Sequence, residues 1–166
     1  MQKIVVTGGC GYIGSHVARA FKFNGNEVTL IDRVKRNHTL KDMDGFYIGD
    51  YAGSGALSLL HSLQPDVIVH CAGTSLVGPS KIDPAEYYDN NVAKTIAMLN
   101  FVKEFDKKPI IMFSSSASVY GEPKEFPIKE TCPKNPISPY GRTKSMIEDI
   151  LVDYHAAYHL QSDCFR

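Results

Sequence analysis

Residues 3–15 read KIVVTGGCGYIGS, and the expected fold of the whole chain follows from them. Residues 4–6 are apolar and β-branched, which is typical of a buried strand in a parallel sheet. A glycine-rich turn occupies residues 7–14, and residues 15–23 have helical character. A strand that runs through such a turn into a helix points backbone amides and the positive end of a helix dipole at one place. That place suits a phosphate group.

Three glycines of this turn have separate tasks in a dinucleotide site. Gly8 allows the tight turn, Gly11 lets a pyrophosphate approach the backbone, and Gly14 lets the helix pack closely on the strand. Glycines alone are a weak signal, because an ordinary turn can have the same spacing. The apolar run VTLID strengthens it: the run ends at Asp32, about 20 residues further on, where a carboxylate can accept hydrogen bonds from a ribose.

The overall composition excludes several classes of function. The 166 residues suffice for one domain with a proper apolar core, because 43% of them are hydrophobic. The 18 basic and 18 acidic side chains cancel, whereas a dedicated nucleic-acid binder would normally carry a basic excess. No apolar run is long enough to span a membrane. The four separated cysteines show no metal-ligand spacing, which predicts no metal site and free thiols in a reducing cytoplasm.

Strand and helix signals alternate along the chain. Strands are predicted at residues 4–6, 28–32, 46–50, 67–71 and 110–113, with helices at 15–23, 56–63, 84–105 and from 139 onward. Asp83 can cap the third helix, with Pro84 in its first turn, and Ser138 and Pro139 start the last one. His70 ends a strand that should be buried, which favours a hydrogen-bonded core histidine. The alternation predicts an α/β fold with a Rossmann-type doubly wound parallel sheet.

A second group of residues indicates proton transfer. Tyr140 and Lys144 are four residues apart at the start of the last helix, so both side chains project from one face. A tyrosine with an ordinary pKa near ~10 is a poor base, but a lysine ammonium one turn away favours the phenolate. Such a phenolate can accept a proton from a substrate hydroxyl, and Ser116 can hydrogen-bond the same oxygen. A purely structural Tyr-x-x-x-Lys pair is common on helices and stays the alternative at this point.

Three motifs together resemble the extended short-chain dehydrogenase/reductase family. They are TGGCGYIGS from Thr7, SSSASVYG from Ser114 and SPYGRTK from Ser138. Within that family the chain is most similar to the UDP-glucose 4-epimerases. The resemblance implies that Tyr140 removes the proton of the sugar C4 hydroxyl, giving a transient 4-keto sugar that is then reduced on its other face.

Two other functions stay open beside the epimerase. One is a non-catalytic NAD-binding module, for which a phenolate base has no use. The other is a nucleotide-sugar dehydratase, a relative whose pattern places an acidic pair before Val-Tyr-Gly. Ala117 and Ser118 occupy those positions here, which argues against the expulsion of water.

The resemblance also implies a cofactor, a substrate and a partner. The cofactor is NAD and the substrate a UDP-sugar, with Tyr140, Lys144 and Ser116 as catalytic residues. A homodimer is implied through the helices that start near Pro84 and Pro139. The residues implied to bind NAD are Gly8, Gly11, Tyr12, Ile13, Gly14, Asp32, Arg33, Asp50, Tyr51, Cys71, Ala72, Gly73, Asn91, Tyr140 and Lys144.

The chain departs from the family pattern in two ways. Ser75 stands where such epimerases often carry a lysine near the cofactor. The sequence also stops at Arg166, where the family begins a further strand and then a smaller substrate domain. We therefore expect residues 1–166 to be an NAD-binding domain truncated near the start of its sixth strand, without the C-terminal substrate domain. Such a chain should leave an apolar sheet edge uncovered, bind NAD, and epimerise poorly or not at all.

Overall fold

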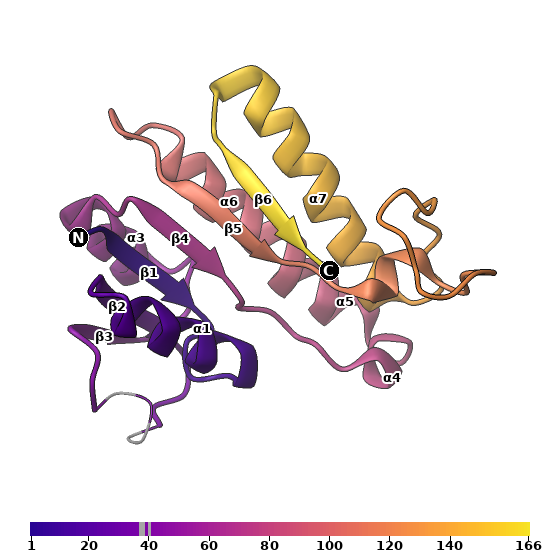
Figure 1. The fold of residues 1–166 in the computed structure, drawn as a ribbon, viewed down its shortest axis with the longest axis horizontal. Coiled ribbons are helices and arrows are strands. Elements are labelled where there is room, and N and C mark those ends of the chain that lie inside the picture. The colour runs from indigo at the N-terminus through magenta and orange to yellow at the C-terminus, as the bar shows by residue number, and fades with distance from the viewer. Residues whose placement is uncertain (37–38, 40) are drawn as a thin grey trace.

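A parallel sheet in the order β3-β2-β1-β4-β5-β6 forms the centre of the computed structural model, which describes residues 1–36, 39 and 41–166 (Figure 1). The strands are β1 (Lys3–Thr7), β2 (Glu27–Asp32), β3 (Gly45–Ile48), β4 (Val67–His70), β5 (Ile110–Ser114) and β6 (Ser162–Phe165). Every neighbouring pair runs parallel. The predicted Rossmann-type sheet is therefore confirmed.

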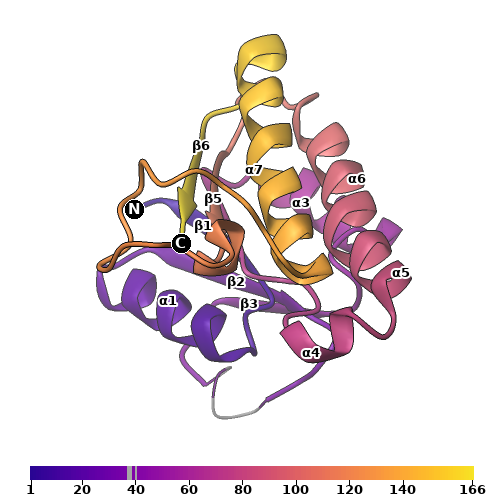
Figure 2. The same cartoon turned by 90° about the vertical axis from the view of Figure 1, so that its right-hand side faces the viewer.

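Helices cover both faces of this sheet. They are α1 (Tyr12–Phe23), α3 (Ser54–Leu63), α4 (Val77–Ser80), α5 (Pro84–Tyr87), α6 (Lys94–Val102) and α7 (Pro139–Tyr158), with the short helical segments η1 (Tyr88–Ala93) and η2 (Ala117–Tyr120). In Figure 2, α1 lies on one side of the sheet, and α3, α6 and α7 lie on the other. The chain order reverses between β1 and β4, and such a switch point opens a crevice at the carboxyl ends of the strands.

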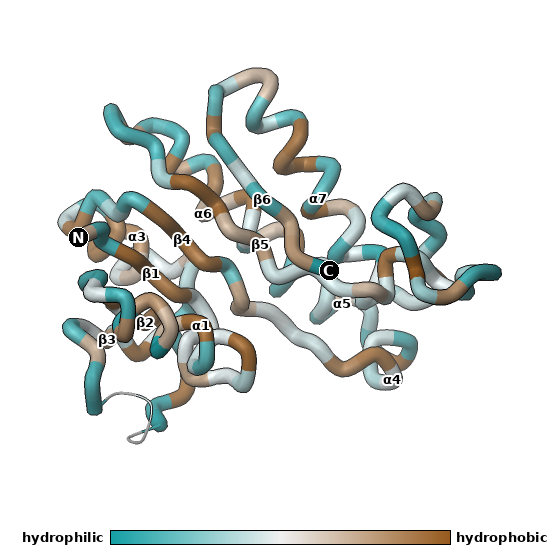
Figure 3. The backbone as a smooth tube through the Cα atoms, viewed as in Figure 1, coloured by the Kyte–Doolittle hydropathy of each residue, from teal (hydrophilic) through white to brown (hydrophobic). Residues whose placement is uncertain are grey.

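Alternate residues of the strands feed two separate apolar clusters. Val5 and Ile68 point to the cluster beneath α3, α6 and α7. Ile4 and Val6 point to the opposite cluster, which Ala18 of α1 completes. Because the central strands β1 and β4 are buried on both faces, they are apolar along most of their length, as the brown tube in Figure 3 shows. Packing on both faces holds the central strands in position, so that their carboxyl ends lie together at one edge of the sheet.

The helix predicted over residues 84–105 consists of three consecutive segments. Its start is confirmed, because the Asp83 side chain accepts a hydrogen bond from the backbone amide of Glu86. Between α5 and α6, however, η1 is a π-helix. Such wide turns frequently occur at functional sites. Here the turn carries two buried asparagines, Asn90 and Asn91, whose side chains leave the helix to bind a neighbouring loop.

Smaller differences occur at other boundaries, and one expectation is wrong. Helix α1 begins three residues earlier than predicted, at Tyr12, and β3 ends at Ile48 instead of residue 50. The sheet edge beside β5 is covered, because the last residues of the chain form β6 and Phe113 pairs with Cys164. The chain can return there because His159, directly after the last residue of α7, has a left-handed conformation (φ 58°), and the buried Leu160 follows it.

Candidate functional site

The turn from β1 into α1 has the geometry of a dinucleotide cradle. Gly8 has φ +68°, and a Cβ atom on it would lie 2.7 Å from the backbone nitrogen of Ala72. A Cβ atom on Gly14 would lie 2.3 Å from the Gly8 carbonyl oxygen. No side chain caps α1 at Gly11, so its first amides have no capping partner within the described part of the chain. These residues fit a bound pyrophosphate, which needs close backbone approach and free amides.

A cavity of about 620 Å³ lies over the carboxyl ends of the central strands. Such a volume suits a cofactor. Most of the residues expected to hold NAD line it: Gly8, Gly11, Tyr12, Ile13, Gly14, Asp32, Arg33, Tyr51, Cys71, Ala72, Gly73, Tyr140 and Lys144. Three of the expected site residues, Asp50, Asn91 and Ser116, are not among the residues that line it.

Asp32 lies at the end of β2 with its carboxylate held by two backbone amides. One oxygen accepts a hydrogen bond from the Cys10 amide and the other from the Val34 amide, both over 2.9 Å. Each oxygen keeps a lone pair for a further donor such as a ribose hydroxyl. Arg33 and Arg36 line the same end of the cavity and bring positive charge beside this carboxylate.

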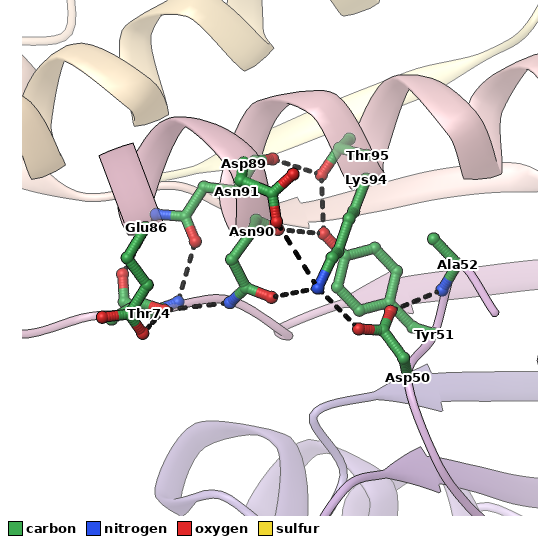
Figure 4. Close-up of polar contacts among 10 residues, drawn as sticks. All are labelled: Asp50, Tyr51, Ala52, Thr74, Glu86, Asp89, Asn90, Asn91, Lys94 and Thr95. Carbon is green, nitrogen blue, oxygen red and sulfur yellow. Dashed lines mark hydrogen bonds and ion pairs between the residues drawn. The ribbon is translucent and has the colours of Figure 1, made fainter. Parts of the chain in front are cut away.

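Asp50 has a structural partner instead of an open position in the cavity (Figure 4). Its carboxylate accepts hydrogen bonds from Lys94 Nζ over 2.7 Å and from the Ala52 amide over 3.0 Å. Burial opposes the charge of Asp50, but these hydrogen bonds outweigh it and hold its pKa below the ordinary value. The pair ties the loop after β3 to the start of α6 and so places the neighbouring Tyr51, which does line the cavity.

Asn91 of the π-helix acts on the loop that follows β4. Its Oδ1 accepts from the Thr74 amide over 2.7 Å, and its Nδ2 donates to the Thr74 carbonyl and to Thr143 Oγ1. Asn90 Nδ2 donates to the Thr74 hydroxyl, so both asparagines hold one residue of this loop (Figure 4). The adjacent Gly73 has φ +146° and lies against Asn91. Asn91 therefore fixes the cavity wall from behind.

His70 is a buried core histidine, as the sequence predicts. Its Nδ1 lies 2.7 Å from Thr7 Oγ1 and its Nε2 lies 2.9 Å from Thr95 Oγ1. Thr95 donates its own proton to the Asn91 carbonyl, so the Nε2–H group donates to Thr95 and Nδ1 accepts from Thr7. Burial, with a smaller contribution from Lys144, lowers the pKa of His70 to about 3. A neutral imidazole thus links β1 to α6 beneath the cavity.

Tyr140 and Lys144 lie together at the opposite end of the cavity, on the first turns of α7. Lys144 Nζ donates to the Ser114 carbonyl over 2.9 Å and lies 5.9 Å from the centroid of the Tyr140 ring. Burial lowers the pKa of Lys144 to about 8, although the nearby Cys71 thiol raises it slightly. The two residues expected to act as a base and its activator therefore share one wall of the cavity.

Ser116 is the N-cap of the short helix η2, which packs against α7. Its hydroxyl oxygen accepts from the Ser118 amide over 3.2 Å, and the hydroxyl donates to Ser118 Oγ over 3.1 Å. To donate to a substrate oxygen, the hydroxyl would exchange its Ser118 acceptor for that oxygen. Such an exchange needs only rotation about one side-chain bond.

Sequence reasoning missed several residues of the cavity wall. Cys10 lies within the TGGCGYIGS motif, and Ser114 and Ser115 lie within SSSASVYG, so these motifs could have indicated all three residues. Phe165 and Arg166 enter the wall because β6 lies beside β5. The family resemblance implies a strand near these residues, but not that they line the cavity. The further lining residues are Ile31, Val34, Arg36, Gly49 and Ser75.

Two kinds of feature are absent from the described residues. No three His, Cys, Asp or Glu side chains in the described ranges gather closely enough to hold a metal ion. Within the same ranges, no helix has both the length and the apolar character needed to cross a bilayer.

Comparison with known proteins matches this geometry. The profile of a family described as the NAD dependent epimerase/dehydratase family matches residues 4–166. The chain is similar to the UDP-glucose 4-epimerase of Halalkalibacterium halodurans, with 42% identity over 98% of this chain and 49% of that protein. The UDP-glucose 4-epimerase of Streptococcus mutans is also 42% identical, over 95% of this chain and 49% of its own length. The chain thus spans about half the length of the curated relatives it matches.

Solved structures give the same picture. A crystal structure of UDP-glucose 4-epimerase from Brucella ovis in complex with NAD superposes with a TM-score of 0.92 at 35% identity, covering 99% of this chain and 51% of that one. The enzyme from Bifidobacterium longum in complex with NAD+ and UDP gives a TM-score of 0.90 at 33% identity, with 99% and 52% coverage.

Proposed function

The chain belongs to the NAD dependent epimerase/dehydratase family, and from that premise we propose that it is the cofactor-binding part of a UDP-glucose 4-epimerase. Such an enzyme interconverts UDP-glucose and UDP-galactose by inverting C4 of the sugar. The observation that carries the proposal is one cavity that joins the Gly8–Gly14 cradle to the Tyr140–Lys144 pair. A site for binding alone has no use for the second of these features.

The proposed cofactor is NAD, and the cavity is large enough to hold it. The uncapped amides of α1 would meet the pyrophosphate, and the Asp32 carboxylate would accept hydrogen bonds from the adenosine ribose. Asp32 disfavours a 2′-phosphate there, which supports NAD over NADP. When bound, NAD would supply the acceptor and donor of the hydride at the sugar C4.

The chain's own residues would move one proton. Lys144 brings a positive charge to 5.9 Å from the centroid of the Tyr140 ring, in a buried and weakly screened space. The Tyr140 phenolate would accept the proton of the C4 hydroxyl and later return it, while Ser116 would donate a hydrogen bond to the same oxygen. Lys144 stays in place because the Ser114 carbonyl accepts from it.

Dehydration is disfavoured by the residues of η2. A dehydratase needs a proton donor to expel water, and the acidic pair of those relatives has no counterpart in Ala117 and Ser118. The Ser118 amide and hydroxyl bond to Ser116 instead. In the proposed reaction the sugar therefore keeps all its hydroxyl groups, and only the configuration at C4 changes.

Two further proposals concern the setting of the chain. Homodimerisation through the helices that begin near Pro84 and Pro139 is supported by exposed apolar side chains on α7, Met146, Val152 and Tyr158. A cytoplasmic location is supported by four free cysteines within the described residues. Light scattering of the purified chain would test the dimer.

The Tyr140→Phe variant tests the catalytic proposal. It removes the hydroxyl and keeps the ring, so NAD binding measured by calorimetry should stay within about threefold, whereas epimerisation of UDP-galactose should fall about 100–10,000-fold. Tyr158→Phe, a change at an exposed ring on the same helix, is the matched control. Turnover is assayed at high substrate concentration.

The outcomes separate the two functions. NAD binding with turnover that depends on Tyr140 supports the epimerase. Turnover that is equal in Tyr140→Phe and the wild type would contradict the catalytic role of Tyr140, and absence of NAD binding would contradict both functions.

A further inference from the structure

A buried carboxylate lies next to the catalytic residues without taking part in the proton transfer. Glu148 is on α7, one helical turn after Lys144, and its side chain is only 4% exposed. Its Oε1 accepts hydrogen bonds from Ser115 Oγ over 2.5 Å and from Arg166 Nε over 2.9 Å. Its Oε2 accepts from Arg166 Nη2 over 2.7 Å and lies 3.5 Å from Lys134 Nζ.

These partners keep Glu148 charged. Burial opposes the charge, but the hydrogen bonds from Arg166 and Ser115 outweigh it and hold the pKa of Glu148 below the ordinary value. The same pairing raises the pKa of Arg166. Glu148 is buried, whereas the Arg166 side chain is 27% exposed, and the two-pronged contact between them restrains both side chains. Removing Arg166 would leave the buried carboxylate charge without this partner.

Two consecutive turns of α7 hold two consecutive residues at the end of β5. Tyr140, Lys144 and Glu148 are spaced by four residues and therefore lie on one face of the helix. Lys144 holds the carbonyl of Ser114, and Glu148 holds the hydroxyl of Ser115.

The same carboxylate also reaches the far end of η2. Arg166, held in a two-pronged contact by Glu148, donates from Nη1 to the Tyr120 hydroxyl over 2.6 Å. The segment from Ser115 to Tyr120 is thus tied to Glu148 at both ends, and Ser116 lies inside it. A hydroxyl that must meet the same substrate oxygen as Tyr140 needs this kind of restraint, because small displacements are costly in catalysis.

We propose that Glu148 is a positioning residue that, through Ser115 and Arg166, holds the β5–η2 segment and thereby sets Ser116 against Tyr140. The catalytic consequence of this restraint rests on the proposed epimerase function. Glu148 itself touches neither substrate nor cofactor.

The first experiment measures the restraint without using activity. Glu148→Gln keeps the shape and removes the charge, and Asp149→Asn makes the same change at the neighbouring exposed carboxylate, which pairs with Lys134. Hydrogen exchange of residues 114–120 should become about tenfold faster in Glu148→Gln than in Asp149→Asn, at matched global stability. Equal exchange in the two variants would overturn the proposal, whether or not the chain proves to be an epimerase.

The second experiment asks whether Glu148 acts through Ser115. In the NAD-loaded protein, Ser115→Ala and Glu148→Gln should each lower kcat by about 10–100-fold, while the dissociation constant for NAD changes less than about threefold. The double variant should lose no more than the stronger single one, because both changes break one link. Additive losses, or a loss confined to thermal stability, would contradict a positioning role. If the wild-type chain shows no turnover, the exchange experiment alone decides the role of Glu148, and absence of NAD binding is the separate result that would overturn the proposed function.

Discussion

Two helices begin at the cavity, and their first turns differ in kind. Helix α1 starts at Gly11 with no side-chain cap and no acidic residue in its first turn. Helix α7 starts at Ser138, whose hydroxyl oxygen accepts from the Gly141 amide over 3.1 Å, and Pro139 follows at a position that needs no donor.

The difference shows how one fold provides both binding and chemistry. At α1 the amides stay available, so the helix dipole and the backbone can receive an anion. At α7 the Ser138 hydroxyl accepts from the Gly141 amide and Pro139 has no amide proton, so this helix contributes side chains: Tyr140 and Lys144 line the cavity and Glu148 holds its margin. The α1 turn therefore needs a ligand to be complete, whereas the α7 turn is complete by itself.

The largest expected effect comes from giving α1 a cap of its own. Gly11 has extended backbone angles, which an N-cap aspartate can adopt. The Gly11→Asp carboxylate would occupy the anion site and repel the pyrophosphate, so NAD affinity should fall about 1,000-fold, which is about 4 kcal/mol. Calorimetric titration with NAD measures this directly.

The Gly11→Ala variant adds a Cβ atom without a carboxylate, so it measures the effect of side-chain size on NAD affinity apart from the effect of charge. Its Cβ atom would lie 3.2 Å from the Gly8 carbonyl oxygen, which is tight but tolerable after a small shift. We expect a loss of NAD affinity below about tenfold for alanine. Equal losses for alanine and aspartate would show that space, and not the free amides, governs binding at α1.

Lys144 provides a test of the role of α7, because its burial affects the stability of the chain. Its pKa is lowered from 10.5 to about 8 by burial, so the folded chain holds fewer protons than the unfolded chain between these values. The burial therefore costs stability below about pH 8, and the cost disappears as the pH rises toward 10.5. Below pH 8 this cost lowers the free energy of unfolding by about 3 kcal/mol. The hydrogen bond from Lys144 to Ser114, worth about 1 kcal/mol, offsets part of it.

Lys144→Met should consequently stabilise the chain at pH 7 by about 2 kcal/mol and lose epimerase activity. The gain should shrink as the pH rises from 8 to 10.5, which chemical denaturation at several pH values can follow. A variant less stable than the wild type across this range would show that Lys144 is held for structure and not for catalysis.

The sequence predicts the glycine-rich turn before α1 and the start of α7 better than the cavity walls between them. The glycines of the α1 turn and the Ser138-Pro139 start of α7 are local features, so their spacing along the chain suffices. Asn91 and Glu148 depend on which segments the sheet brings together, because their partners lie 17 to 52 and 18 to 33 residues away.

Asp50 illustrates the same limit from the other direction. A carboxylate after β3 is a reasonable cofactor ligand by its place in the sequence. Its partner Lys94 is 44 residues away and on a different element, so only the folded arrangement reveals that this charge is already paired. Long-range polar pairs of this kind leave no periodicity or spacing for a single sequence to display.

The smallest expected effect concerns the cap of α7. Ser138→Ala removes the acceptor of the Gly141 amide and should lower the free energy of unfolding by about 1 kcal/mol. Since a protein-made cap does not depend on a ligand, the loss should be the same with and without saturating NAD, as thermal unfolding in both conditions would measure. Ser145→Ala, a change within the body of the same helix, is the control. If NAD abolished the difference between Ser138→Ala and the wild type, the start of α7 would be coupled to the cofactor, and the contrast between the two helices would not hold.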